Sequence, residues 1–125
     1  MYHFLIVAAG GALGAGARHL TNLAMARLLG LAFPWGTLTV NVVGGLLMGL
    51  FVELLARRFG GSAELRLFVA TGILGGFTTF SAFSLDVAAM YERGAVAVAI
   101  FYVVASVVLS IGALFFGMWL AKSLA

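Results

Sequence analysis

The sequence predicts an all-α membrane protein with four transmembrane helices, the third of which is broken at mid-membrane. Of its 125 residues, 64% are hydrophobic and only 9% are charged, and the mean hydropathy is +1.19. Soluble domains carry about 25% charged residues. A spanning helix takes roughly 20 apolar residues, so this length allows about four spans and no large soluble domain. We therefore expect residues 1–125 to form a single transmembrane domain.

The four expected spans cover residues 3–28, 35–55, 64–91 and 95–120. The first is rich in glycine up to Arg18 and then continues as an amphipathic helix. Ser62 or Glu64 can cap the third span, because both side chains accept hydrogen bonds from a first-turn amide. No segment shows the period-2 alternation of a barrel strand, so we expect helices throughout.

The third span contains a polar interruption at residues 75–81, whose sequence is Gly-Gly-Phe-Thr-Thr-Phe-Ser. Two adjacent glycines and two adjacent β-branched threonines are poor helix formers, so we expect the helix to break there. Broken backbone at membrane depth is tolerated only where protein buries it or where it lines a wet cavity. The sequence therefore places its ion chemistry at residues 75–84.

The positive charges give only a weak orientation signal. With four spans, one side of the membrane carries Arg57, Arg58, Arg66 and Lys122, and the other carries Arg27 and Arg93, with Arg18 if it reaches that surface. So small a bias leaves two alternatives open: insertion in both orientations, or a single orientation with Arg57 and Arg58 in the cytoplasm. The net charge of +3 is scattered along the chain, which favours membrane anchoring over nucleic-acid binding.

Small residues recur at four-residue spacing on three of the spans. The pairs are Gly10 with Gly14, Gly45 with Gly49, and Gly72 with Gly76. Such pairs allow two helix backbones to approach closely, either within one chain or between chains. The abundance of these pairs favours an oligomer.

Asn41, Phe80 and Phe83 are candidates for contact with an anion. The amide of Asn41 can donate two hydrogen bonds, and its alternative role is to hold neighbouring helices together. Phe80 and Phe83 are three residues apart and so share a helix face. An aromatic ring is electropositive around its edge, which suits an anion, although aromatic pairs in helices also serve as core.

Tyr102, Ser106 and Ser110 recur every four residues and draw a row of hydroxyls along the fourth span. Together with Ser81 at the helix break, this row predicts a track for an ion. The alternative is that the hydroxyls bond the carbonyl four residues earlier in their own helix. Arg18 is a candidate for raising the potential in an anion vestibule, and its alternative is snorkelling to the interface.

Acidic residues are absent from the centres of the expected spans. Glu53 faces Arg57 at i,i+4 spacing, and Glu64, Asp86 and Glu92 lie towards helix ends. Proton-coupled cation transport therefore lacks its usual carrier. The sequence contains no cysteine, phosphate-binding loop, metal-ligand cluster or nucleophile–base pair, so it gives no support for an enzyme.

Three segments resemble the signature segments of the Fluc-type (CrcB-like) fluoride channels. They are Gly14-Ala15-Gly16-Ala17-Arg18, residues 36–44 (Gly-Thr-Leu-Thr-Val-Asn-Val-Val-Gly), and residues 75–84 (Gly-Gly-Phe-Thr-Thr-Phe-Ser-Ala-Phe-Ser). The third segment is highly specific, whereas the first would mean little alone. The resemblance extends over essentially the whole chain, including its length and four-span pattern.

The resemblance implies a channel in the bacterial inner membrane through which fluoride leaves the cytoplasm passively. It also implies an antiparallel, dual-topology homodimer with two pores along the subunit interface. In that arrangement Asn41, Phe80 and Phe83 line the fluoride path, Tyr102, Ser106 and Ser110 form a polar track, and Arg18 matches the family arginine. Gly75 and Thr78 supply backbone carbonyls to a structural sodium ion on the dimer two-fold axis. Family members commonly carry a threonine where this chain has Ala82, so one hydroxyl is missing and conductance can differ.

Two other functions remain as alternatives. A small dual-topology exporter of drugs in exchange for protons has a similar size, but it needs a central carboxylate in the first span, and residues 4–17 contain none. A membrane scaffold that transports nothing would use its polar residues only for packing. A fluoride-efflux assay separates these three functions.

Overall fold

The computed structural model describes residues 2–58 and 60–124. Over these residues the chain forms α1 (Tyr2–Leu29), α2 (Trp35–Arg58), α3 (Ala63–Arg66), the π-helix η1 (Leu67–Leu74), α4 (Gly75–Phe77), α5 (Ser81–Glu92) and α6 (Val96–Leu124). Four helical stretches are long and apolar enough to cross a membrane: Tyr2–Leu29, Trp35–Arg58, Ala63–Glu92 and Val96–Leu124. The four predicted spans are confirmed, with shifts of a few residues at their ends.

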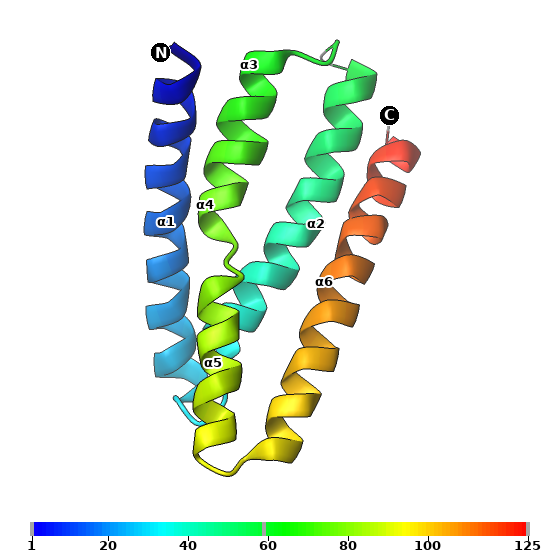
Figure 1. The fold of residues 1–125 in the computed structure, drawn as a ribbon. Coiled ribbons are helices and arrows are strands. Elements are labelled where there is room, and N and C mark those ends of the chain that lie inside the picture. The colour runs from blue at the N-terminus through cyan, green and yellow to red at the C-terminus, as the bar shows by residue number, and fades with distance from the viewer. Residues whose placement is uncertain (1, 59, 125) are drawn as a thin grey trace.

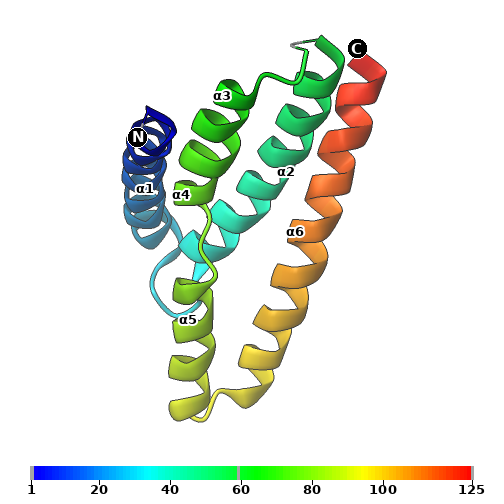
Figure 2. The same cartoon turned by 45° about the horizontal axis from the view of Figure 1, so that its top comes forward.

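The spans run alternately up and down (Figure 1). The described N-terminal end of α1, the connection from α2 to α3, and the C-terminal end of α6 lie at one end of the bundle. The connections from α1 to α2 and from α5 to α6 lie at the opposite end. α2 packs along α6, whereas α1 packs along η1 and α4. Figure 2 shows the result, in which the third span lies between α1 and α6.

The helix ends follow local rules that the sequence contains. The amide of Leu65 donates to Ser62 Oγ at 3.3 Å, so Ser62 is the cap of the third span. Gly94 has a φ of +82° and its amide donates to the Tyr91 carbonyl at 3.0 Å, which turns the chain from α5 into α6. Glu53 Oε1 accepts a hydrogen bond from Arg57 Nε at 3.1 Å, as the i,i+4 spacing predicts.

Glycine allows two pairs of helices to touch backbone to backbone. A Cβ atom at Gly10 would lie 3.0 Å from the Cα of Gly72, and one at Gly76 would lie 2.6 Å from the carbonyl oxygen of Gly11. On the other side of the bundle, a Cβ at Gly45 would lie 2.7 Å from the Ser110 carbonyl oxygen. These are contacts within the chain. These glycine spacings therefore serve packing within the chain, one of the two roles that the sequence leaves open for them.

Candidate functional site

The third span breaks where the sequence predicts. α4 ends at Phe77, Thr78 is extended with φ −81° and ψ 160°, and helix resumes at Ser81. The residues before α4 form the π-helix η1, in which carbonyls bond amides five residues later. The glycine and threonine content predicts the break, but no feature of the sequence predicts the π-helix.

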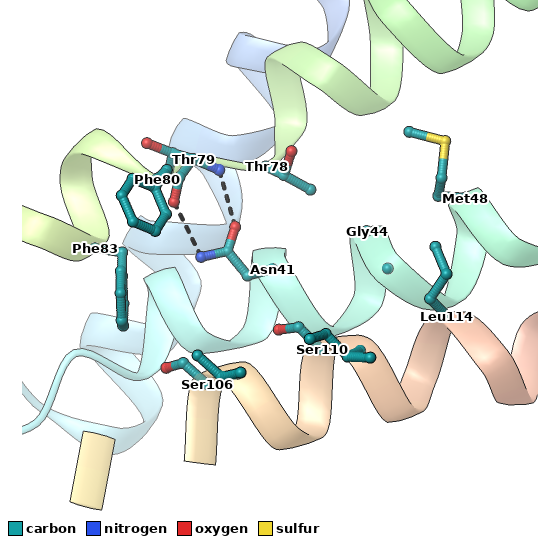
Figure 3. Close-up of a pocket in the computed structure, with 13 residues that line it drawn as sticks. Asn41, Gly44, Met48, Thr78, Thr79, Phe80, Phe83, Ser106, Ser110 and Leu114 are labelled. Carbon is teal, nitrogen blue, oxygen red and sulfur yellow. Dashed lines mark hydrogen bonds between the residues drawn. The ribbon is translucent and has the colours of Figure 1, made fainter. Parts of the chain in front are cut away.

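The side chain of Asn41 holds the broken backbone. The Thr79 amide donates to Asn41 Oδ1 at 2.8 Å, and Asn41 Nδ2 donates to the Thr79 carbonyl at 3.0 Å (Figure 3). The two bonds replace helical partners that Thr79 has lost. Because a primary amide has two donor hydrogens and two acceptor lone pairs, one N–H and one lone pair of Asn41 remain for other partners. Asn41 thus links two helices, as its alternative role predicts, and still lies at the cavity described below.

The break also frees two carbonyl oxygens. In a continuous helix the Gly75 carbonyl would accept from the Thr79 amide, and the Thr78 carbonyl would accept from the Ala82 amide. The Thr79 amide instead donates to Asn41, and the Ala82 amide donates to Thr79 Oγ1 at 3.1 Å. The two carbonyls that the family resemblance assigns to sodium are therefore those whose helical donors bond side chains instead.

An open-sided cavity of about 380 Å³ lies between α2, the helix break and α6. Asn41, Phe80, Phe83, Ser106 and Ser110 all line it, so the fold brings together five of the seven residues predicted for the ion path. Ser81 and Tyr102 do not line it. The Ser81 hydroxyl lies 3.4 Å from Thr79 Oγ1, on an exposed residue at the start of α5.

Phe80 and Phe83 touch but lie in different surroundings. Their ring centroids are 5.5 Å apart, as expected for residues on one helix face. Phe83 is only 8% exposed and packs on Tyr102 with centroids 5.1 Å apart. Phe80 is 78% exposed. Phe83 therefore belongs both to the core of the chain and to the cavity wall, whereas Phe80 presents its ring to whatever lies outside the chain.

The hydroxyls of Ser106 and Ser110 are buried polar atoms without a hydrogen-bond partner among the described residues. The alternative that they bond the carbonyl four residues earlier is therefore wrong. A buried hydroxyl without a partner costs free energy, so such groups in native proteins meet water, an ion or another ligand. Both serines lie on α6 beside Asn41 and point towards the cavity (Figure 3).

Tyr102 continues the same helical row but has a partner. It is completely buried, and its hydroxyl donates to Asp86 Oδ2 at 2.9 Å. Asp86 lies midway along α5 and towards the end of the third span, as expected from the sequence. This pair was missed, although the sequence contains its signal. Asp86 and Tyr102 lie at equal distances on either side of Gly94, so a tight antiparallel turn there sets them side by side.

Arg18 is half-buried on α1 and does not line the cavity. α1 lies on the far side of the third span from α6 (Figure 2). The structure therefore does not bring Arg18 together with the other predicted residues within one chain. Among residues 2–58 and 60–124, no group of three or more His, Asp or Glu side chains could hold a metal ion.

Comparison with known proteins gives a consistent result over the full chain. The family model described as "CrcB-like protein, Camphor Resistance (CrcB)" matches residues 5–118. The chain is 64% identical over 124 residues to a "Fluoride-specific ion channel FluC" of Chelativorans sp. (strain BNC1), covering 99% of both chains. Proteins with the same name from Mesorhizobium japonicum and Agrobacterium fabrum are 60% and 53% identical, again covering 99% of each chain. With its four apolar helices and broken third span, the chain belongs to the CrcB-like family.

Proposed function

We propose that this chain forms a fluoride-selective channel through which fluoride leaves the bacterial cytoplasm passively. The chain is a multi-pass bacterial membrane protein, and we assign it to the inner membrane. It is not an enzyme. The relatives named as fluoride channels support the substrate, and the two buried, unpartnered hydroxyls of Ser106 and Ser110 beside the cavity carry the argument from structure.

The chemistry of the cavity suits a small, strongly hydrated anion. A selective pore must replace the water of fluoride with closely placed donors. Ser106 and Ser110 supply two hydroxyls, and Asn41 supplies the N–H that Thr79 leaves free. The ring edges of Phe80 and Phe83 add weak positive potential without a fixed cation that would trap the ion. We place Ser81 and Tyr102 further along the path, because both adjoin residues of the cavity wall.

The working unit we propose is an antiparallel homodimer of dual topology. The weak difference in Arg and Lys between the two sides of the membrane supports insertion in both orientations. The exposed ring of Phe80, next to the cavity, supports a second copy that completes the path. Arg18, which lies outside the cavity of its own chain, would then raise the potential at the mouth of the path rather than contact the ion inside it.

We also propose a structural sodium ion on the two-fold axis of this dimer, held by the carbonyl oxygens of Gly75 and Thr78. The residues fit such an ion, because both oxygens have lost their helical donors and hard cations prefer oxygen ligands. When bound, the cation would supply a positive field that favours anions nearby. Asn41 and the Thr79 hydroxyl would keep the two carbonyls free by bonding the amides that would otherwise cover them.

Efflux of fluoride from loaded proteoliposomes tests the function. With a potassium ionophore to balance charge, vesicles that contain the protein should release fluoride rapidly and retain chloride. Equal release of both anions would contradict selectivity, and release of neither would contradict the channel. Proton-driven export of drugs is not favoured, because α1 contains no acidic residue that could carry the proton.

A further inference from the structure

The cavity changes from polar to apolar along its length. On α2, Asn41, Gly45 and Met48 lie four and three residues apart and therefore share a face. On α6, Ser106, Ser110 and Leu114 form a row at four-residue spacing. Figure 3 shows Asn41 and the two serines at one end of the cavity, and Met48 beside Leu114 at the other.

Glycine brings the backbones of α2 and α6 together at the apolar end of the cavity. A Cβ atom at Gly49, the residue after Met48, would lie 3.0 Å from the Met118 amide and would collide with the Leu114 carbonyl oxygen. The backbones of α2 and α6 are thus in direct contact beside Met48 and Leu114. Met48 and Leu114 therefore line the cavity at the end where the two helix backbones touch.

Beyond Ser110, the row on α6 offers no polar side chain over a long distance. The next members at four-residue spacing are Leu114 and Met118, and the first polar one is Lys122. At 1.5 Å per residue, Ser110 and Lys122 are about 18 Å apart along the helix. A hydrated anion that leaves the serines in this direction loses its donors at Met48 and Leu114, and apolar constrictions of this kind control ion passage by excluding water.

We propose that Met48 and Leu114 form an apolar constriction that sets the rate at which the anion passes this end of the cavity. The inference rests on the proposed channel function and deepens it. The two residues determine throughput rather than selectivity, because they offer the ion no donor. Asn41, Ser106 and Ser110 bind and orient the ion, and the constriction decides how often it leaves them.

Near-isosteric polar substitutions test the constriction. Met48→Gln and Leu114→Asn keep most of the side-chain volume and add a donor, and Leu114→Ala widens the passage while favouring the helix. The initial rate of fluoride efflux per folded protein should rise about tenfold in the two polar variants, the effect on a rate of one hydrogen bond to a charged group. It should also rise in Leu114→Ala, because the passage is wider. Gel filtration in detergent gives the amount of folded protein for each variant.

Two controls separate the constriction from general effects of polarity. Leu109→Asn and Leu109→Ala alter a half-exposed leucine on α6 that does not line the cavity, and both should leave the rate unchanged. Equal or slower efflux in the folded polar variants and in Leu114→Ala, while the unaltered protein conducts, would overturn the constriction and leave the channel function intact. An unaltered protein that releases no fluoride would overturn both.

Discussion

Asn41 is the residue on which the broken span depends most. Its amide bonds both the N–H and the carbonyl of Thr79, so one side chain satisfies two backbone groups at membrane depth. Lipid offers such groups no water, so both need a partner within the protein, and the oxygen and nitrogen of one amide serve the two. The same side chain retains one donor, so the structural role and the proposed contact with the anion belong to one group.

Replacing Asn41 separates these roles. Asn41→Ala leaves both groups of Thr79 without partners, which we expect to cost about 1–3 kcal/mol of stability for each buried group and to abolish most fluoride efflux. Asn41→Asp keeps an acceptor for the Thr79 amide but loses the donor and adds a negative charge. It should retain more stability than Asn41→Ala while conducting no better. Thermal unfolding in detergent and liposome efflux measure the two effects, and full efflux by Asn41→Asp would exclude Asn41 from the ion path.

The two phenylalanines allow a second test at this scale. Phe80→Leu and Phe83→Leu keep most of the apolar volume and remove the electropositive ring edge, so fluoride efflux per folded protein should fall sharply in both. Phe83 also packs on Tyr102, whereas Phe80 is exposed in the single chain. We therefore expect the Phe83 variant to lose stability as well. Unchanged efflux with lowered stability would identify the rings as core residues only.

At the scale of elements, close contact between helices carries the architecture. α1 meets η1 and α4 through glycines, and α2 meets α6 in the same way. In lipid the hydrophobic effect does not drive helices together, so the stabilisation comes from dispersion and weak hydrogen bonds that need backbones in contact. The third span can break and still stay in place because α1 packs along η1 and α4 on one side, and α2 contacts η1, α4 and α5 on the other.

A matched pair of glycines on α1 tests this packing. A Cβ at Gly14 would lie 2.8 Å from the Phe77 amide and would collide with the Ile73 carbonyl oxygen, whereas a Cβ at Gly16 would meet nothing within 4 Å. Gly14→Ala should lower the unfolding temperature and efflux together. Gly16→Ala should leave efflux unchanged and gain up to about 1 kcal/mol from helix propensity. Equal behaviour of the two variants would show that α1 does not hold the break.

At the scale of the whole molecule, the chain exposes large apolar side chains along α1 and α6 that only lipid or another chain can cover. Such a surface is expected of a membrane protein, and its near-balanced charge leaves the orientation open. That balance and the exposed side of the cavity at Phe80 are the two observations that support the proposed dimer.

Labelling from the two sides of the membrane tests the dual topology. The chain contains no native cysteine, and Ser123 is exposed near the described end of α6. Ser123→Cys should react equally with membrane-impermeant reagents applied from each side, because half of the copies insert in each orientation. Reaction from one side only would contradict dual topology without contradicting fluoride conduction.

Composition and local pattern determined a large part of this protein. Hydropathy placed four spans within a few residues of the observed helices, because a spanning helix must be long and apolar whatever it packs against. The break, the cap at Ser62 and the pair of Glu53 with Arg57 followed from residue types at fixed local spacing. The row of Ser106 and Ser110 and the candidate role of Asn41 followed in the same way.

Only the tertiary structure decided which groups from distant parts of the chain contact one another. The glycine spacings serve contacts within the chain, Asp86 bonds Tyr102, and Arg18 lies outside the cavity, all of which depend on how distant segments pack. The π-helix of η1 was also seen only in the structure, because no residue type in it requires that winding. Local sequence fixes backbone preferences within a turn or two, whereas the partner of a side chain is fixed by the position of other helices in space.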